Sequence, residues 1–216
     1  MTDTGQSTGQ PARQVSNWNV PNALTTLRIV MVPFFGWALL YDGGHHQGAR
    51  WLAWGLFVAA MITDKVDGDL ARKHDLVTDF GKIADPIADK AITGMAFIGL
   101  AIIADFLPAW LWWTITVVVL VREWGVTAAR LSIARDVVMP AKQSGKVKTT
   151  AQALALGGFV APFGLWTGGL DWLGDLVWWL FAVTLAVAVV LTITSGVEFA
   201  RDVARDRAER RTARTG

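Results

Sequence analysis

The sequence contains no cysteine among its 216 residues, which excludes disulfide bonds and metal sites built on thiolates. It also has few charged residues: Asp, Glu, Lys and Arg make up 18%, against about a quarter in ordinary soluble domains. The first 17 residues are polar and lack the basic-then-apolar order of a secretory signal, so no cleaved leader is expected. No glycine-rich phosphate loop or dinucleotide-binding fingerprint occurs, and no nucleic-acid partner is expected.

Apolar residues are what the sequence has in abundance. They account for 53% of the chain, and the mean hydropathy is +0.38. We therefore expect an all-α integral membrane protein whose length suits one helical bundle. Six spans are predicted, at residues 22–41, 51–73, 82–104, 108–133, 147–168 and 175–200. The chain then divides into a polar tail (1–17), a six-helix transmembrane domain (18–200) and a basic tail (201–216).

Lys and Arg are distributed unevenly between the connections. Arg50 is the only Lys or Arg in the 41–50, 104–108 and 168–175 connections. The 64–82 and 130–148 connections and the C-terminal tail are basic. Basic connections favour the cytoplasmic side, so both termini are expected in the cytoplasm and the protein in the cell (inner) membrane. Tryptophans gather at the opposite ends of the spans, as in an interfacial aromatic belt: Trp51, Trp54, Trp110, Trp112, Trp113, Trp166, Trp172 and Trp178.

The stretch TDKVDGDLARKHDLVTDFGKIADPIADK, residues 63–90, contains seven aspartates and no glutamate between two apolar runs. Helical spacing places Asp64, Asp67, Gly68 and Ala71 on one face, and Gly81, Asp85 and Asp89 on one face of the next helix. Converging carboxylates in a low-dielectric setting repel unless they are neutralised. Oxygen-only ligands suit Mg²⁺ or Mn²⁺, so we expect a pair of divalent ions held by Asp64, Asp67, Asp85 and Asp89 at the cytoplasmic end of the bundle. The remaining aspartates, Asp69, Asp75 and Asp79, lie off these faces and are interpreted as solvated.

These residues resemble the signature of the CDP-alcohol phosphatidyltransferase family, D-x2-D-G-x2-A-R-x8-G-x3-D-x3-D, at all eight fixed positions. The resemblance implies a catalytic membrane domain that transfers a phosphatidyl group from CDP-diacylglycerol to an alcohol and releases CMP. It further implies that all four aspartates bind metal, that Asp89 is also the catalytic base, and that the protein forms a homodimer. The CDP-diacylglycerol site would be lined by Asn22, Thr25, Gly68, Ala71, Arg72, Thr78 and Gly81.

Two further stretches, at 19–35 and 121–152, resemble the members of the family that use sn-glycerol 3-phosphate as the acceptor. The residues themselves favour a phosphorylated acceptor, because cations recur at the expected cytoplasmic mouth and could hold a phosphate dianion: Arg28, Arg122, Arg130, Lys146 and Lys148. The tendency of basic residues to stay cytoplasmic already explains part of this set, but not Arg28 or Arg122, which lie deeper in apolar sequence. Arg122 and Glu123 could instead form a structural ion pair.

Two alternatives stay open from the sequence. Within the family, the acceptor could be inositol phosphate, or phosphatidylglycerol itself. Outside it, the aspartates could form the transport site of a divalent-cation transporter, although such sites lie near the middle of the membrane between repeated halves. The sequence has no convincing internal repeat, and its aspartates are expected at one edge.

Overall fold

The computed structural model describes residues 19–74, 78–103, 107–133, 143–162 and 171–215, and all regular structure within these ranges is helical. The α-helices are α1 (Val20–Leu40), α2 (Gln47–Lys73), α3 (Asp79–Ile103), α4 (Ala109–Ile133), α5 (Gln143–Val160) and α6 (Asp171–Thr215), with a 3₁₀ turn η1 (Tyr41–Gly44) after α1. The all-α class is therefore as predicted, and each predicted span overlaps one of these helices. The largest differences are at α5, which ends eight residues early, and α6, which continues fifteen residues past the expected end.

Four of the six helices are long and apolar enough to cross a membrane: segments Val20–Gly44, Phe80–Ile103, Ala109–Ala129 and Trp172–Asp202. α2 and α5 do not belong to this set. α2 carries three aspartates and several basic residues in its second half, and α5 begins with two lysines in its first turns. By length and composition, four of the described helices are therefore suited to cross a membrane, as expected for an integral membrane protein.

Polar side chains fix where three helices begin. Asn19 caps α1, since its side-chain oxygen accepts a hydrogen bond from the backbone N–H of Asn22 across 2.9 Å. His46 caps α2 through Nδ1, 3.1 Å from the N–H of Ala49. Thr78 precedes α3, and its Oγ1 accepts from the N–H of Gly81 across 3.0 Å. Such caps satisfy backbone donors that have no partner inside the helix, so the first turns of α1 and α3 are held in place.

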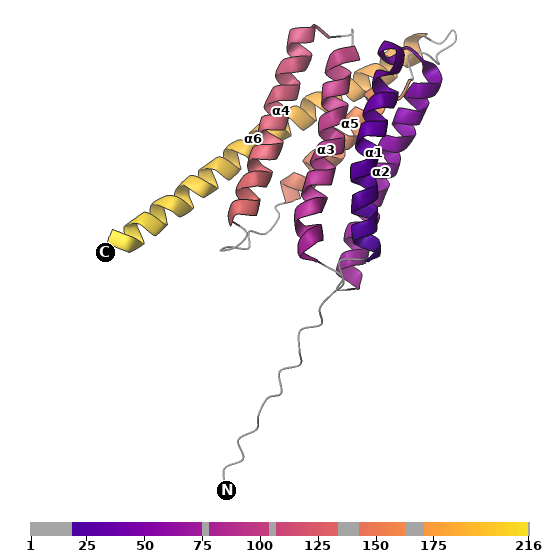
Figure 1. Cartoon of the computed structure of the whole chain (residues 1–216). Helices are drawn as coiled ribbons and strands as arrows, with labels where there is room; N and C mark the ends of the chain where they lie inside the picture. Colours follow the sequence, from indigo (N-terminus) through magenta and orange to yellow (C-terminus); the bar gives the residue numbers. More distant parts are fainter. Residues whose placement is uncertain (1–18, 75–77, 104–106, 134–142, 163–170, 216) are drawn as a thin grey trace.

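The helices form one bundle in which α1 packs against both α2 and α3, α4 against α3 and α6, and α5 chiefly against α6. Figure 1 shows the first turns of α1, α3 and α5 at the same end of the bundle as the last turns of α2 and α4. The residues predicted for the site therefore come from helix ends that share one end of the molecule. α6 crosses the others obliquely, and its C-terminal part extends beyond them (Figure 1).

Aromatic and small residues fill the core between these helices. The rings of Phe35 and Phe57 join α1 to α2, with centroids 5.8 Å apart. Gly99 allows α3 to approach α1 closely, because a Cβ there would lie 2.5 Å from Cδ2 of Leu39. Trp112, predicted to belong to the interfacial belt, is instead fully buried and packs edge-on against Phe159, with centroids 5.8 Å apart.

Arg50 joins α2 to α5 at the end of the bundle opposite the aspartates. Its guanidinium donates to the backbone oxygens of Phe159, at 2.7 Å, and Val160, at 2.9 Å. These are the last carbonyls of α5, which have no partner inside their own helix. Asp64 lies 14 residues further along α2, or about 21 Å at the helical rise. Arg50, the one basic residue of the 41–50, 104–108 and 168–175 connections, is therefore bound to the end of α5.

The helix α6 shows no break at the predicted boundary between the transmembrane domain and the basic tail. It has 45 residues, a length of about 68 Å, roughly twice what a bilayer core requires. Its apolar segment ends at Asp202, and the arginine-rich sequence after that continues the same helix. The boundary at residue 200 stays a prediction based on composition.

Candidate active site

The first turns of α1 and α3 meet in a small cluster of polar side chains. The amide Nδ2 of Asn22 lies 2.9 Å from Oγ1 of Thr78, which is also the cap of α3. One turn further along α1, the hydroxyl of Thr25 donates to the carboxylate of Asp85. Asn22, Thr25 and Thr78 are all buried. Three residues predicted to contact the nucleotide therefore lie together, and they connect directly to one of the four aspartates.

Gly81 lies in the middle of this cluster. A Cβ at this position would lie 3.1 Å from Oδ1 of Asn22, 3.4 Å from Oγ1 of Thr78 and 3.7 Å from Oδ2 of Asp85. A side chain would therefore crowd these polar groups. The three nearest atoms are all side-chain oxygens, so a side chain at this position would displace polar groups of the cluster.

Arg28, one turn beyond Thr25 on α1, pairs with Asp64 and Asp67, the two aspartates of α2 that belong to the motif. Its Nη1 lies 2.6 Å from Asp64, and its Nη2 donates to Asp67. The side chain of Arg28 is 0% exposed, that of Asp67 is 3% exposed and that of Asp64 is 43% exposed. We predicted that Arg28 would bind the acceptor phosphate; in this structure its guanidinium is engaged by the aspartates, and its Nε has no hydrogen-bond partner among the described residues.

The four aspartates of the motif are close enough to affect one another. Asp64 is repelled by the charges of Asp85 and Asp89, and Asp67 by those of Asp64 and Asp85. Among the described residues, no three carboxylate or imidazole groups are already arranged to hold a metal ion. The guanidinium of Arg28 lies between Asp64 and Asp67, where it neutralises two of the carboxylates.

The chemistry of this donor set nevertheless fits a divalent cation. All the candidate ligands are carboxylate oxygens, which are the ligands that Mg²⁺ and Mn²⁺ prefer. The carboxylates converge from two helices, and a cationic group already lies among them. A metal would therefore be held by Asp64, Asp67, Asp85 and Asp89, with Arg28 as a competing cation.

A second cluster begins at Asp89 and has the opposite charge. The ammonium of Lys90 lies 2.6 Å from Oδ2 of Asp89 and 3.0 Å from Oε2 of Glu123 on α4. Lys90 therefore bridges the predicted catalytic base to a buried carboxylate on a neighbouring helix.

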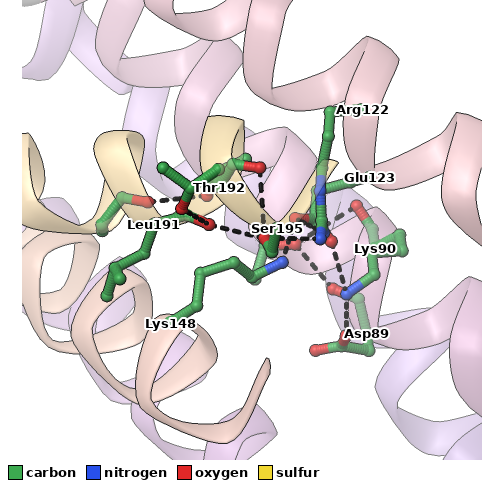
Figure 2. A network of polar contacts seen from close by, with 11 residues as sticks. Asp89, Lys90, Arg122, Glu123, Lys148, Leu191, Thr192 and Ser195 are labelled. Carbon is green, nitrogen blue, oxygen red and sulfur yellow. Dashed lines mark hydrogen bonds and ion pairs between the residues drawn. The ribbon is translucent and has the colours of Figure 1, made fainter. Parts of the chain in front are cut away.

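Glu123 is the centre of this second cluster, which Figure 2 shows from close by. Its carboxylate is 5% exposed and also accepts from Lys148 of α5 and, across 2.8 Å, from Nη1 of Arg122. Nη2 of Arg122 in turn donates to Oγ of Ser195 on α6, across 2.8 Å. We call Lys90, Arg122, Glu123 and Lys148 the cation cluster. The ion pair between Arg122 and Glu123 that the sequence left open is therefore present, as part of a larger network.

The predicted site residues that the structure describes fall into these two groups. Asn22, Thr25, Arg28, Thr78 and Gly81 lie with the aspartates, and Arg122 and Lys148 lie in the cation cluster. Gly68 follows Asp67 on α2. The side chains of Ala71, Arg72, Arg130 and Lys146 lie outside the described part of the structure, so their predicted roles rest on the sequence.

Sequence reasoning missed Lys90 and Ser195 and did not recognise the central position of Glu123. A signal existed for Lys90, which directly follows the last aspartate of the motif. Glu123 was visible only as the neighbour of Arg122. Ser195 lies in an apolar span 73 residues away from Arg122, and no local pattern distinguishes it from other helix serines.

The sequence is similar to known proteins along most of its length. A sequence model of the CDP-alcohol phosphatidyltransferase family matches residues 18–194. A Mycobacterium tuberculosis protein named probable phosphatidylglycerophosphate synthase is 46% identical over 199 residues, which cover 92% of this chain and 88% of that protein. Proteins named CDP-diacylglycerol–glycerol-3-phosphate 3-phosphatidyltransferase from Bacillus subtilis and Rickettsia felis are 37% and 36% identical, each over 84% of this chain and 93% of their own length.

The pairing of Arg28 with two aspartates leads to a prediction about stability. Replacing Arg28 by Met leaves Asp64 and Asp67 without their counter-charge, and breaking a buried pair in this way costs about 3–5 kcal/mol. We expect the purified variant to melt at a clearly lower temperature than the unmodified protein when divalent ions are chelated, and to recover most of the difference when Mn²⁺ is added.

Arg201→Met, which changes an exposed arginine on α6, is the matched control and should leave the melting temperature unchanged. An Arg28→Met variant that gains no more from Mn²⁺ than the unmodified protein would show that arginine and metal do not compete for the same carboxylates.

Proposed function

The chain belongs to the CDP-alcohol phosphatidyltransferase family, and we propose that it transfers the phosphatidyl group of CDP-diacylglycerol to sn-glycerol 3-phosphate, giving phosphatidylglycerol phosphate and CMP. The observation that carries this proposal is the meeting of two oppositely charged groups at Asp89. Four aspartates lie on one side, and the cation cluster begins at the next residue, Lys90. A donor whose diphosphate is bound through metal needs the aspartates. A phosphorylated acceptor needs cations next to them.

The donor would bind on the side of the aspartates. Asp64, Asp67, Asp85 and Asp89 would hold Mg²⁺ or Mn²⁺, with two ions as expected from the mutual repulsion of four converging carboxylates. The metal would supply charge neutralisation for the diphosphate and its leaving group. Asn22, Thr25, Thr78 and Gly81 would contact the cytidine diphosphate, together with Gly68, Ala71 and Arg72.

The transfer itself requires a nucleophile and a place for its proton. A hydroxyl oxygen of glycerol 3-phosphate forms a bond to the phosphorus that carries the diacylglycerol, and the bond from that phosphorus to the CMP oxygen breaks. The hydroxyl proton passes to the carboxylate of Asp89, which acts as the general base. CMP leaves as a phosphate monoester anion, so no oxidant, reductant or further reactant is needed.

The acceptor phosphate would bind in the cation cluster. Lys90, Arg122 and Lys148 surround Glu123, and with Asp89 included the five groups carry a net charge of +1 (three cations against two carboxylates). Nε of Arg122 is buried without a hydrogen-bond partner among the described residues, so it is free to donate to a phosphate oxygen. Arg130 and Lys146 are proposed to complete this site. Arg28 is proposed to act on the donor side, where its partners lie.

The proposed membrane arrangement has six spans, with both termini and the active site on the cytoplasmic side of the inner membrane. α2 and α5 would cross together with the four apolar helices, because their polar groups can face the bundle: Asp67 is 3% and Lys148 4% exposed. Ionisable residues that face a bundle interior cost much less than those that face lipid. A homodimer is proposed from the family resemblance alone.

The function is tested by CMP release from CDP-diacylglycerol with a panel of acceptors: glycerol 3-phosphate, inositol phosphate and phosphatidylglycerol. We expect glycerol 3-phosphate to be used as an acceptor and the other two to be poor acceptors.

Asp89→Asn should still bind the donor with metal present but turn over about 10²–10⁴-fold more slowly, the range for loss of a general base. Asp175→Asn, an exposed position on α6, is the control and should keep full turnover.

Preference for another acceptor would leave the reaction class intact and replace the proposed substrate. Absence of CMP release with every acceptor, together with Mn²⁺ flux into protein-containing liposomes, would favour the transporter alternative.

The arrangement in the membrane can be tested cleanly because the chain has no cysteine. His45 and His74 are exposed and lie in or next to the short turns at opposite ends of α2. In intact cells, His45→Cys should react with a membrane-impermeant maleimide, and His74→Cys should react only after permeabilisation. The unmodified protein should stay unlabelled throughout. Labelling of His74→Cys in intact cells would place the aspartates on the outer side.

A further inference from the structure

Glu123 has more counter-charges than a single carboxylate requires. Three cations from three helices converge on it: Lys90 from α3, Arg122 from α4 and Lys148 from α5. A single cation would already neutralise the formal charge of this carboxylate, and here there are three. Ser195 adds a fourth helix, α6, through its contact with Arg122. The glutamate is therefore at the point where four helices of the bundle are connected by polar contacts.

The three cations repel one another, and all three contact the negative charge of Glu123, which offsets that repulsion. Glu123 and Lys148 are 5% and 4% exposed, so water does little to screen this repulsion. Arg122 is held by two contacts in different directions, to Glu123 and to Ser195, each at 2.8 Å. The side chain of Arg122 also lies against α6, since a Cβ added at Gly196 of that helix would lie 3.0 Å from Cγ of Arg122. The guanidinium therefore has a fixed direction.

We propose that Glu123 is a positioning residue for the acceptor: it holds Lys90, Arg122 and Lys148 in one place so that a phosphate group bound there lies next to Asp89. This inference rests on the proposed function and adds a residue that contacts the cations rather than the substrate. Lys90 also connects the proposed phosphate site to the proposed base, because its ammonium contacts both Glu123 and Asp89. The distance between the phosphate site and the base is thus set by one side chain.

Two simpler interpretations predict different results for the same substitution. If only total charge matters, Glu123→Gln removes a negative charge beside an anion site, and binding of glycerol 3-phosphate should become tighter. If Glu123 only stabilises the bundle, its loss should impair donor and acceptor kinetics alike. If Glu123 positions the cations, Glu123→Gln should weaken binding of glycerol 3-phosphate even though the site has become more positive. Binding of CDP-diacylglycerol should not change.

The experiment measures steady-state kinetics of purified Glu123→Gln, Glu123→Asp and Ser195→Ala against both substrates. Glu123→Gln should raise the KM for glycerol 3-phosphate by about tenfold or more and change the KM for CDP-diacylglycerol less than about twofold. Glu123→Asp keeps the charge and should recover part of the loss. Ser195→Ala removes only one contact of Arg122 and should raise the acceptor KM by a smaller factor. Glu198→Gln, an exposed glutamate on α6, is the matched control and should behave like the unmodified protein.

Each outcome decides between these interpretations. A lower acceptor KM in Glu123→Gln overturns positioning in favour of total charge, and equal losses for both substrates overturn it in favour of a structural role. If Glu123→Gln does not fold, Ser195→Ala decides, and an unchanged acceptor KM in that variant overturns the proposal. If the unmodified protein does not use glycerol 3-phosphate, the proposed function fails first, which the same assay shows before any variant is compared.

Discussion

A carboxylate among apolar helices is stable only with a counter-charge or a hydrogen-bond donor within a few ångströms, and most polar contacts of the site follow from this constraint. An unpaired buried ion costs several kcal/mol, so every carboxylate described here between the helices has a partner. Asp64 and Asp67 share Arg28, Asp85 accepts from Thr25, Asp89 has Lys90, and Glu123 has three cations. At this end of the bundle these pairs connect α1 to α2 and α3, and α4 to α3 and α5.

These pairs lie in two regions of opposite charge, one suited to the donor and the other to the acceptor. Aspartates dominate where α1, α2 and α3 meet, and cations dominate where α3, α4, α5 and α6 meet. Asp89 and Lys90 are consecutive residues, so the boundary between the regions falls at one peptide bond of α3. A reaction that joins a metal-bound diphosphate to a phosphorylated alcohol needs its base at such a boundary, because the attacking hydroxyl must lie between the two anionic groups.

Much of this could be predicted from the sequence because it depends on spacing within single helices. The register of Asp64 with Asp67 and of Asp85 with Asp89 follows from the helical repeat, and the apolar runs gave the six helices. Contacts between helices could not be predicted in this way. Nothing in the local sequence pairs Arg28 with residues 36 and 39 positions away, or Lys148 with Glu123. Trp112 was misplaced for the same reason, since its partner Phe159 lies on another helix.

The central claim is that the two regions serve different substrates, and the most direct test is the kinetics of Arg122→Ala. This arginine contacts Glu123 and Ser195 in the cation cluster, and none of its described contacts is with the four aspartates. Charge-assisted hydrogen bonds to a phosphate are worth roughly 1.5–3 kcal/mol each, so the KM for glycerol 3-phosphate should rise by about tenfold or more, while the KM for CDP-diacylglycerol stays within about twofold. A raised KM for CDP-diacylglycerol with an unchanged KM for glycerol 3-phosphate would contradict the account, because it would place the donor diphosphate in the cation cluster.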